Sequence, residues 1–398
     1  MKQHIIYILT MLSISPVHSQ HQDSLQISLL TVSPRNTEIY TIYGHTALRL
    51  QNTETSTDIV FNWGTFDTSR KNFMYNFVRG ETDYYLSSEP YIHFKRAYIT
   101  SGAQIIEQTL NIPDSIKPLL VQEINKNLLP ENIEYRYNYF FDNCTLRPRD
   151  IIEKYCGGIL VYPEQDKKIT LRDLVHECTS PYPWMKFGID IVIGSGADSL
   201  ISRRTSLFLP AKLSETLNNT YIQFPDGIRK PIITSVISSN NISSSAATET
   251  KASTSFLSNP LSVFTSLFFF YLIINLCSIK KKTIFRLPFA LLFMTAGAGG
   301  IIVAFLMLFS THPCVSSNWN IIWLNPLYLI GFASTITKKR YKVFTLYHSI
   351  NFYLLTVFLL FLQWIPQHID IACLPLVLCL WIAEFTIYLT NIKRVSQP

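Results

Sequence analysis

The chain has 398 residues, of which 48% are hydrophobic, and a formal net charge of +7 at pH 7. This length allows two or more domains, and the concentration of apolar residues in about the last 140 positions excludes a wholly soluble protein. The net charge does not indicate a nucleic-acid partner, because residues 256–398 carry ten Lys or Arg against two acidic residues and the rest of the chain is close to neutral.

The first 19 residues have the pattern of a secretory signal peptide. Lys2 gives a short basic region, Ile5–Ile14 an apolar one, and Val17–Ser19 a small-residue cleavage pattern before Gln20. The alternative is an uncleaved anchor helix, but the apolar run is short for a membrane span. We therefore expect an exported protein.

Residues 21–234 mix short alternating segments with helical ones, which predicts a soluble α+β domain. Thr41–Leu50 and Asp58–Trp63 flank a polar turn and predict a β-hairpin. Lys71–Val78 and Lys117–Leu128 predict helices. Residues 235–258 are rich in Ser, Asn, Thr and Ala, a composition typical of a flexible linker.

Residues 259–392 predict a bundle of five transmembrane helices. We expect the helices near 260–279, 287–309, 320–336, 343–363 and 371–391. The third is short and carries Asn325-Pro326, so we expect its first turn to be broken or to lie at the interface beside Trp319 and Trp323. All ten basic residues of this region lie in 280–286, 338–342 and 393–394, which is typical of cytoplasmic loops. The soluble domain is then periplasmic and the C-terminus cytoplasmic. Helical bundles belong to the inner membrane, where we expect this multi-pass protein.

Cys144 is the strongest candidate for a reactive group. The chain has seven cysteines, three of them in the soluble domain, and this odd number leaves at least one free thiol. Cys144 follows Asp142 and Asn143 and precedes the helical stretch Thr145–Tyr155, so it would lie at a helix N-terminus, which favours a thiolate. Arg147 adds positive charge nearby.

A structural disulfide or an inert core thiol is the alternative reading of Cys144. Cys156 lies twelve residues further on, or about 18 Å along a helix, which is too far for a disulfide. Pairing with Cys178 stays open.

A thiol enzyme needs a base, and four histidines lie in the soluble domain at positions 21, 45, 93 and 176. His45 follows Tyr43 and Gly44 at the start of an alternating strand, where the alternative is an ordinary strand histidine. His176 is followed by Glu177 and Cys178, and consecutive side chains cannot converge on one ion, so we expect no metal and no cofactor.

Tyr43-Gly44-His45, followed about 100 residues later by Asn143-Cys144, resembles the circularly permuted branch of the papain-like NlpC/P60 superfamily, in which His precedes Cys. More specifically, the chain resembles the Lnb-type lipoprotein N-acyltransferases. The matching stretches are Tyr43–Ala47, Phe61–Asp67, Thr82–Tyr84, Asn138–Asp150, Pro183–Asp190, His312–Pro313 and Asn318–Pro326. The resemblance implies a permuted NlpC/P60-like domain followed by a five-helix transmembrane domain.

The resemblance implies Cys144 as nucleophile and His45 as base. The residue that orients His45 is not clear from it; we choose Asn62, on the neighbouring strand of the predicted hairpin, ahead of Asp67. The expected substrate-binding residues come from the matching stretches and are Tyr43, Asn143, Arg147, His312 and Trp319.

The expected reaction moves an acyl chain from a glycerophospholipid, through a Cys144 thioester, to the α-amino group of a diacylglyceryl-cysteine lipoprotein. A five-helix anchor suits substrates that lie in a membrane. The alternatives are a cysteine endopeptidase or amidase acting on peptidoglycan, and a non-catalytic envelope scaffold. Glu384, a carboxylate inside the fifth helix, is a second functional candidate, because such residues are costly there.

Overall fold

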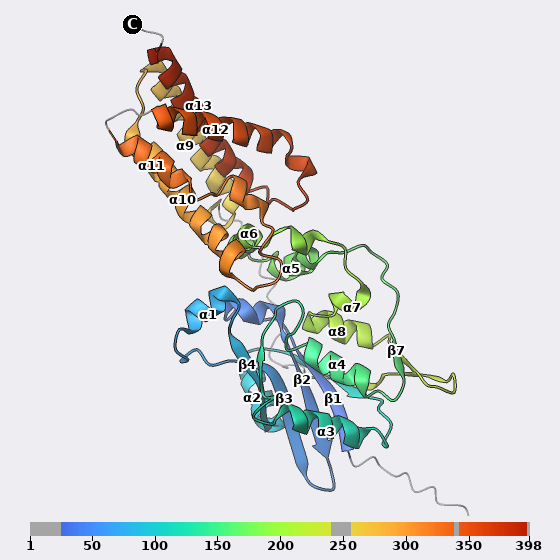
Figure 1. Cartoon of the computed structure of the whole chain (residues 1–398). Coiled ribbons are helices and arrows are strands. Elements are labelled where there is room, and N and C mark those ends of the chain that lie inside the picture. The colour runs from blue at the N-terminus through green and yellow to red at the C-terminus, as the bar shows by residue number, and fades with distance from the viewer. Residues whose placement is uncertain (1–24, 240–255, 338–341, 396–398) are drawn as a thin grey trace, which may run out of the picture.

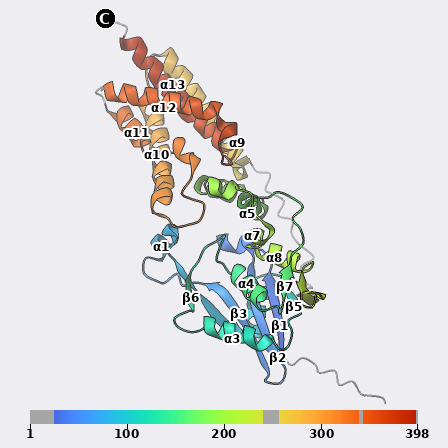
Figure 2. The same cartoon turned by 45° about the vertical axis from the view of Figure 1, so that its right-hand side comes forward.

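The computed structural model describes residues 25–239, 256–337 and 342–395, and it divides into a domain built on a β-sheet and a bundle of long helices (Figure 1). The end of the last helix lies at the pole of the bundle furthest from the sheet, also in the turned view of Figure 2. The predicted α+β domain followed by a helical bundle is confirmed. The predicted signal peptide and the middle of the predicted linker lie outside the described residues.

The main sheet has seven strands in the order β10-β5-β1-β2-β3-β4-β6, and every neighbouring pair is antiparallel. Its strands are β1 Leu25–Val32, β2 His45–Asn52, β3 Thr57–Thr65, β4 Asp83–Pro90, β5 Ile105–Leu110, β6 Glu134–Arg136 and β10 Ile233–Ser239. The predicted hairpin is confirmed as β2 and β3. Its first strand begins at His45, four residues later than predicted, because Ile39–Tyr43 forms the short 3-10 helix η1.

Strand β10 corrects the predicted start of the linker at residue 235. Ser235–Ser239 pairs with β5 through the backbone, and the Ser239 side chain donates to the carbonyl of Ile105 at 3.2 Å. Backbone pairing at a sheet edge needs no apolar side chains, so a Ser-rich composition does not exclude it.

Alternation along the strands gives the sheet two apolar faces. Leu29 and Leu48 point to the larger cluster, whereas Leu30 and Ala47, one residue away on each strand, point to the smaller one. Helices α3 (Lys117–Asn127), α4 (Leu146–Lys154) and α8 (Pro210–Leu217) contribute to the larger cluster, and α2 (Tyr91–Thr100) contributes Phe94 to the smaller one.

The remaining elements of this domain lie mainly between the sheet and the bundle or at the domain's side (Figure 1). They are α1 Phe73–Arg79, α5 Leu171–Thr179, α6 Pro183–Val192, η2 Ser195–Asp198, α7 Arg203–Ser206, and a small sheet of β7 Ile159–Val161, β8 Tyr221–Gln223 and β9 Arg229–Pro231. Helices α1 and α3 confirm the two predicted helices, with α1 shifted by about two residues.

In the described part of the chain the bundle contains five α-helices, in the predicted order. They are α9 Pro260–Lys280, α10 Arg286–Phe309, α11 Tyr328–Ile336, α12 Lys342–Leu360 and α13 Cys373–Val395, with the short 3-10 helices η3 Phe256–Ser258, η4 Trp319–Ile322 and η5 Leu362–Trp364 between or before them. Four of them, all except α11, are long and apolar enough to cross a membrane.

The third predicted span, residues 320–336, is a regular helix only over Tyr328–Ile336, in agreement with the expected break at its start. Pro326 removes a backbone donor and disfavours helical geometry in the residue before it, so the regular helix begins only at Tyr328. Close packing also fixes this break, because a Cβ on Gly300 of α10 would lie 2.3 Å from the Asn325 carbonyl carbon.

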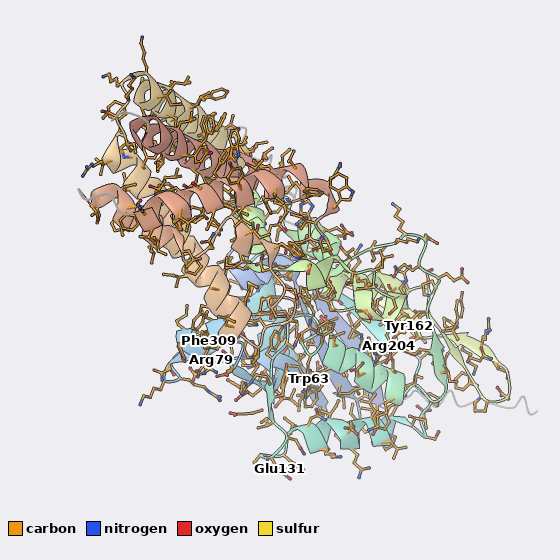
Figure 3. The ribbon with its side chains drawn as sticks, turned by 45° about the horizontal axis from the view of Figure 1, so that its top comes forward. Trp63, Arg79, Glu131, Tyr162, Arg204 and Phe309 are labelled. Atoms are coloured by element: carbon orange, nitrogen blue, oxygen red, sulfur yellow. The ribbon has the colours of Figure 1, made fainter. Side chains whose placement is uncertain are left out.

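The loop between α10 and α11 ties the bundle to α1. The last carbonyls of a helix have no partner within it. Here Ser310 donates to the Val78 carbonyl at 2.9 Å, and the Thr311 backbone N–H donates to that of Arg79 at 2.7 Å. Figure 3 shows Arg79 beside Phe309 at this junction.

The same loop and the loop between α12 and α13 cap α6. Asn318 donates to the Ile191 carbonyl at 2.8 Å and Asn320 to that of Asp190 at 3.1 Å, while Gln367 reaches Ile193 at 3.3 Å. The two inter-helix loops that lack Lys and Arg are thus the ones that contact the periplasmic domain, in agreement with the charge pattern.

A substitution at Gly80 tests how closely α1 packs against the loop that follows α10. The φ of Gly80 is +70°, and an added Cβ would lie 2.7 Å from the His312 backbone nitrogen, whereas Gly102, at φ +79°, has nothing within 4 Å. We expect Gly80→Ala to destabilise the protein by about 1–3 kcal/mol more than Gly102→Ala, because only Gly80 adds a steric clash to the backbone strain. Thermal unfolding of the purified protein measures both; equal midpoints would show that the junction tolerates the methyl group.

Candidate functional site

Asn143 fixes the position of Cys144 at the start of α4. Its Oδ1 accepts from the backbone N–H groups of Thr145 and Leu146, both at 2.9 Å, and its Nδ2 donates to the carbonyls of Tyr139 and Phe208. All four hydrogen-bonding positions of the amide are then occupied. Asn143 was predicted to bind substrate, but the structure gives it a buried helix-capping role instead.

His45 and Cys144 face one another across the start of β2 and of α4. The imidazole and the thiol are close enough for each to shift the pKa of the other, and the His45 Nε2 lies 3.2 Å from the Asn62 Oδ1 on the adjacent strand β3. Because an amide oxygen only accepts, Nε2 carries a proton and Nδ1 is left for the thiol. The Asn62 amide nitrogen in turn donates to Glu89 at 3.1 Å.

The pKa values of the pair are shifted in opposite directions. Burial raises the pKa of the Cys144 thiol, but the His45 imidazole, the Thr46 backbone N–H and the Thr145 hydroxyl outweigh it, and the pKa lies below its ordinary value. Burial lowers the pKa of His45, and here the neighbouring Cys144 and Asn62 prevail and raise it. Together these shifts favour a thiolate beside an imidazolium.

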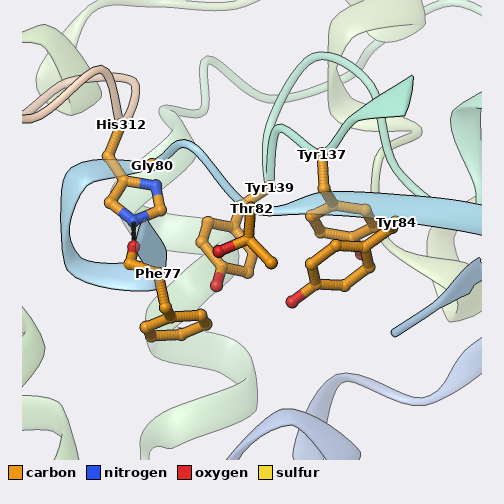
Figure 4. A pocket seen from close by; sticks show the side chains of 7 residues that line it. All are labelled: Phe77, Gly80, Thr82, Tyr84, Tyr137, Tyr139 and His312. Carbon is orange, nitrogen blue, oxygen red and sulfur yellow. Dashed lines mark hydrogen bonds between the residues drawn. The ribbon is translucent and has the colours of Figure 1, made fainter. Parts of the chain in front are cut away.

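A narrow pocket lined mainly by aromatic side chains lies beside Tyr137, which contacts Cys144, and includes His312 from the loop after α10 (Figure 4). The Tyr137 hydroxyl lies 4.0 Å from the Cys144 Sγ, and its ring stacks on Tyr84 at 4.2 Å. At the other end, the His312 Nε2 donates to the Phe77 carbonyl at 2.6 Å, and burial lowers the pKa of His312. The pocket has an internal space of about 10 Å³, no more than one water molecule needs.

His312 is the one expected substrate-binding residue that lines this pocket. Arg147 makes two 2.7 Å contacts to Asp142 and lies over the Tyr135 ring at 3.6 Å, so its guanidinium is already engaged. Tyr43 packs into a separate apolar cluster beside Cys178. Trp319 lies in η4, where its backbone donates to Gln367.

Asp67 does not reach His45, because its Oδ1 accepts from the backbone and hydroxyl of Ser69 within an exposed turn. The structure thus places Asn62, the first choice, beside His45. All seven cysteines are free thiols, and Cys178 forms no disulfide with Cys144.

His176 meets Asp190 and His368 at the junction with the bundle, and their ligand atoms lie within 4.8 Å of one another. Sequence analysis considered only the neighbours of His176 in the chain and could not find this group. Arg172 donates to the Asp190 Oδ1 at 2.6 Å, and Lys186 lies 3.3 Å from Oδ2. Two permanent cations on one carboxylate oppose a metal ion, so the group is better described as an ion-pair cluster.

Glu384 has a buried partner within the bundle. Its Oε2 lies 2.5 Å from the Nδ1 of His348, and the His348 Nε2 lies 2.7 Å from the Ser334 hydroxyl. Glu384 and His348 are 0% and 2% exposed. These contacts link α11, α12 and α13 and explain how a carboxylate is retained in an apolar bundle.

Sequence analysis did not assign Tyr84 or Tyr137 to the site, although both line the pocket. The alternation of Tyr135, Tyr137 and Tyr139 was the available signal, since every second residue of an extended segment points the same way. It could not indicate that Phe77 and His312, from two other parts of the chain, close the same pocket.

Comparison with known families gives two matches. Residues 18–176 match the model described as the Lnb N-terminal periplasmic domain, and residues 251–395 match the Lnb transmembrane domain. No curated protein and no solved structure matches the chain. The resemblance seen in the sequence is confirmed.

The paired pKa shifts predict how Cys144 reacts with iodoacetamide. A thiolate is the reactive form, so alkylation should remain fast at a pH well below the ordinary thiol pKa of about 8.5. In His45→Ala the main charge that lowers the pKa is lost, and the midpoint should move upward. Peptide mass spectrometry after alkylation at a series of pH values measures both midpoints.

Cys178 is the internal control for that experiment, because burial raises its pKa to about 11 and it should stay unmodified at neutral pH. An unchanged midpoint for Cys144 in His45→Ala would contradict the ion pair.

The buried pair in the bundle predicts a non-additive effect on stability. Glu384→Leu leaves His348 without its partner and should destabilise the bundle by about 3–5 kcal/mol, whereas the double variant with His348→Leu should recover part of this loss. Thermal unfolding in detergent compares the variants. A single variant as stable as wild type would show that the contact contributes little.

Proposed function

Because the chain belongs to the Lnb family and carries both of its domains in order, we propose that it is a lipoprotein N-acyltransferase with Cys144 as nucleophile. The chain is a multi-pass membrane protein with a periplasmic N-terminal domain. The proposed acyl donor is a glycerophospholipid and the acceptor a diacylated lipoprotein. The proposed location is the inner membrane, with the C-terminus in the cytoplasm.

The observation that supports the proposal is that Cys144, with His45 as its neighbour, lies next to the residues of a pocket that a loop of the membrane domain helps to form. Tyr137 contacts the Cys144 sulfur at 4.0 Å, and His312, directly after the α10 span, lines the far end of the same pocket. A soluble peptidoglycan substrate gives no reason for a membrane loop at this position, whereas a lipid substrate does.

In the first half-reaction, the Cys144 thiolate attacks the carbonyl carbon of the donor ester. The bond between that carbon and the glycerol oxygen breaks, and the leaving oxygen takes the proton of the His45 imidazolium. The products are a Cys144 thioester and a lysophospholipid. Asn62 holds His45 through Nε2, so that Nδ1 stays directed at the reacting atoms.

Backbone N–H groups at the start of a helix are common donors to an oxyanion, but here they are engaged. The N–H groups of Thr145 and Leu146 are occupied by Asn143, so they are not available to a tetrahedral intermediate. The Tyr137 hydroxyl is the better candidate, because it already lies near the sulfur, and burial raises its pKa so that it keeps its proton.

In the second half-reaction, the free α-amino group of the lipoprotein attacks the thioester carbonyl. His45 takes a proton from the attacking nitrogen, the carbon–sulfur bond breaks, and the Cys144 thiolate leaves. The result is an N-acylated lipoprotein and the starting form of the enzyme.

The test is mass spectrometry of lipoprotein N-terminal peptides from cells that lack this protein, complemented with wild type, Cys144→Ser or Asp67→Asn. Wild type and the turn control Asp67→Asn should restore the third acyl chain, and Cys144→Ser should lose the acylation at least about a hundredfold.

Unchanged acylation in every strain would overturn the proposed reaction. Cleaved cell-wall stem peptides that depend on Cys144 would then favour the hydrolase alternative. Full restoration by Cys144→Ser would instead assign no role to the thiol.

A further inference from the structure

Helix α1 presents an exposed apolar surface next to the end of a membrane span. Met74, Tyr75 and Val78 are 68%, 54% and 39% exposed, and no residue of α1 is buried. Their spacing puts all three on one side of the helix, within an arc of about 100°. We call these three residues the α1 patch. A solvent-exposed helix of a soluble domain usually carries polar residues on that side.

The position of the α1 patch along the membrane normal can be inferred from the length of α10. This helix has 24 residues, or about 36 Å, against about 30 Å for the hydrocarbon core, so its end reaches the headgroup region. Ser310, the first residue after it, donates to the carbonyl of Val78. Leu308 and Phe309, in the last turn of α10, are 74% and 58% exposed. The α1 patch thus continues the apolar surface of the span.

The residues around the patch are those preferred at a membrane interface. Tyr75 combines an apolar ring with a hydroxyl, as residues of the aromatic belt do. Lys71 is exposed before α1, and the Arg79 guanidinium lies 5.6 Å from the Tyr75 ring centre. Positive charge beside an apolar surface suits the phosphate groups of lipids.

The other side of α1 connects to Cys144 through rings. Phe73 and Phe77 are 6.1 Å apart, Phe77 lies 6.3 Å from Tyr139, and Tyr139 lies 5.4 Å from Tyr137, whose hydroxyl contacts the sulfur. Figure 4 shows Phe77, Tyr139 and Tyr137 along one pocket. Ring contacts thus connect the inner side of α1 to Tyr137, whose hydroxyl lies beside the Cys144 sulfur.

We propose that the α1 patch lies in the outer leaflet of the membrane that the chain spans, and that a phospholipid acyl ester reaches Cys144 beside Phe77. The first part stands on the placement of α1 alone; the second rests on the proposed acyltransferase function. Because the pocket holds about one water in the present conformation, its aromatic rings must separate to admit an acyl chain.

The first experiment tests membrane contact. The full-length protein, with Tyr75 replaced by the photo-crosslinker p-benzoylphenylalanine, is illuminated in nanodiscs of phosphatidylethanolamine, phosphatidylglycerol and an alkyne-tagged phospholipid. Leu119, 47% exposed on α3 and far from the bundle in Figure 1, is the negative position, and Phe309 the positive one. Position 75 should give at least ten times the lipid adduct of position 119. An adduct at 309 but none at 75 overturns the proposal.

The second experiment tests access to the nucleophile. The double variant Met74→Glu/Val78→Glu should slow formation of the Cys144 thioester from bilayer phospholipid at least tenfold, while its rate with iodoacetamide stays that of wild type. A wild-type thioester rate in this variant overturns the access path. If wild type itself forms no thioester while position 75 still crosslinks to lipid, the acyltransferase function fails and the membrane contact stands.

Discussion

Unpaired carbonyl groups at the ends of two helices determine how the two domains are joined. Helices α1 and α6 both end at the junction, and their last carbonyls accept hydrogen bonds from the loop that follows α10. A buried carbonyl without a donor costs about 1–3 kcal/mol, so the end of α6, where these bonds are buried or partly buried, favours the docked arrangement. The bond from Ser310 at the end of α1 is exposed and contributes less. The periplasmic domain is therefore held against the membrane at two points, with the aromatic pocket beside one of them.

This constraint connects the chemistry to the membrane. Cys144 is placed by Asn143, and Asn143 is held by the carbonyls of Tyr139 and Phe208 deep in the periplasmic domain. The pocket at Cys144 ends at His312, which belongs to the capping loop. The nucleophile thus has a fixed relation to the bilayer surface, which a flexible attachment would not provide. An enzyme that takes an ester from a lipid headgroup region needs this fixed distance more than it needs a large open cleft.

The stretches that carry the family resemblance separate into two physical roles. Tyr43–Ala47, Phe61–Asp67 and Asn138–Asp150 supply His45, Asn62 and Cys144, which lie together in the candidate site. Pro183–Asp190 forms most of α6, and Asn318–Pro326 supplies the amides that cap it. The matching stretches that lie far from the thiol therefore hold the periplasmic domain against the helix bundle. They need not contact a substrate, and the position of Trp319 in η4 fits this role.

The sequence by itself determined the α+β domain and the apolar helices, because periodicity and hydropathy are local properties, and its motifs carried the family resemblance that suggested Cys144 and His45 as a pair. It did not determine β10, whose pairing is made by the backbone. Only the tertiary structure decided that Asn143 caps a helix, that Tyr137 reaches the sulfur and that His312 closes the pocket. Each of these depends on contacts between segments far apart in the chain, and no local pattern records which distant groups will meet.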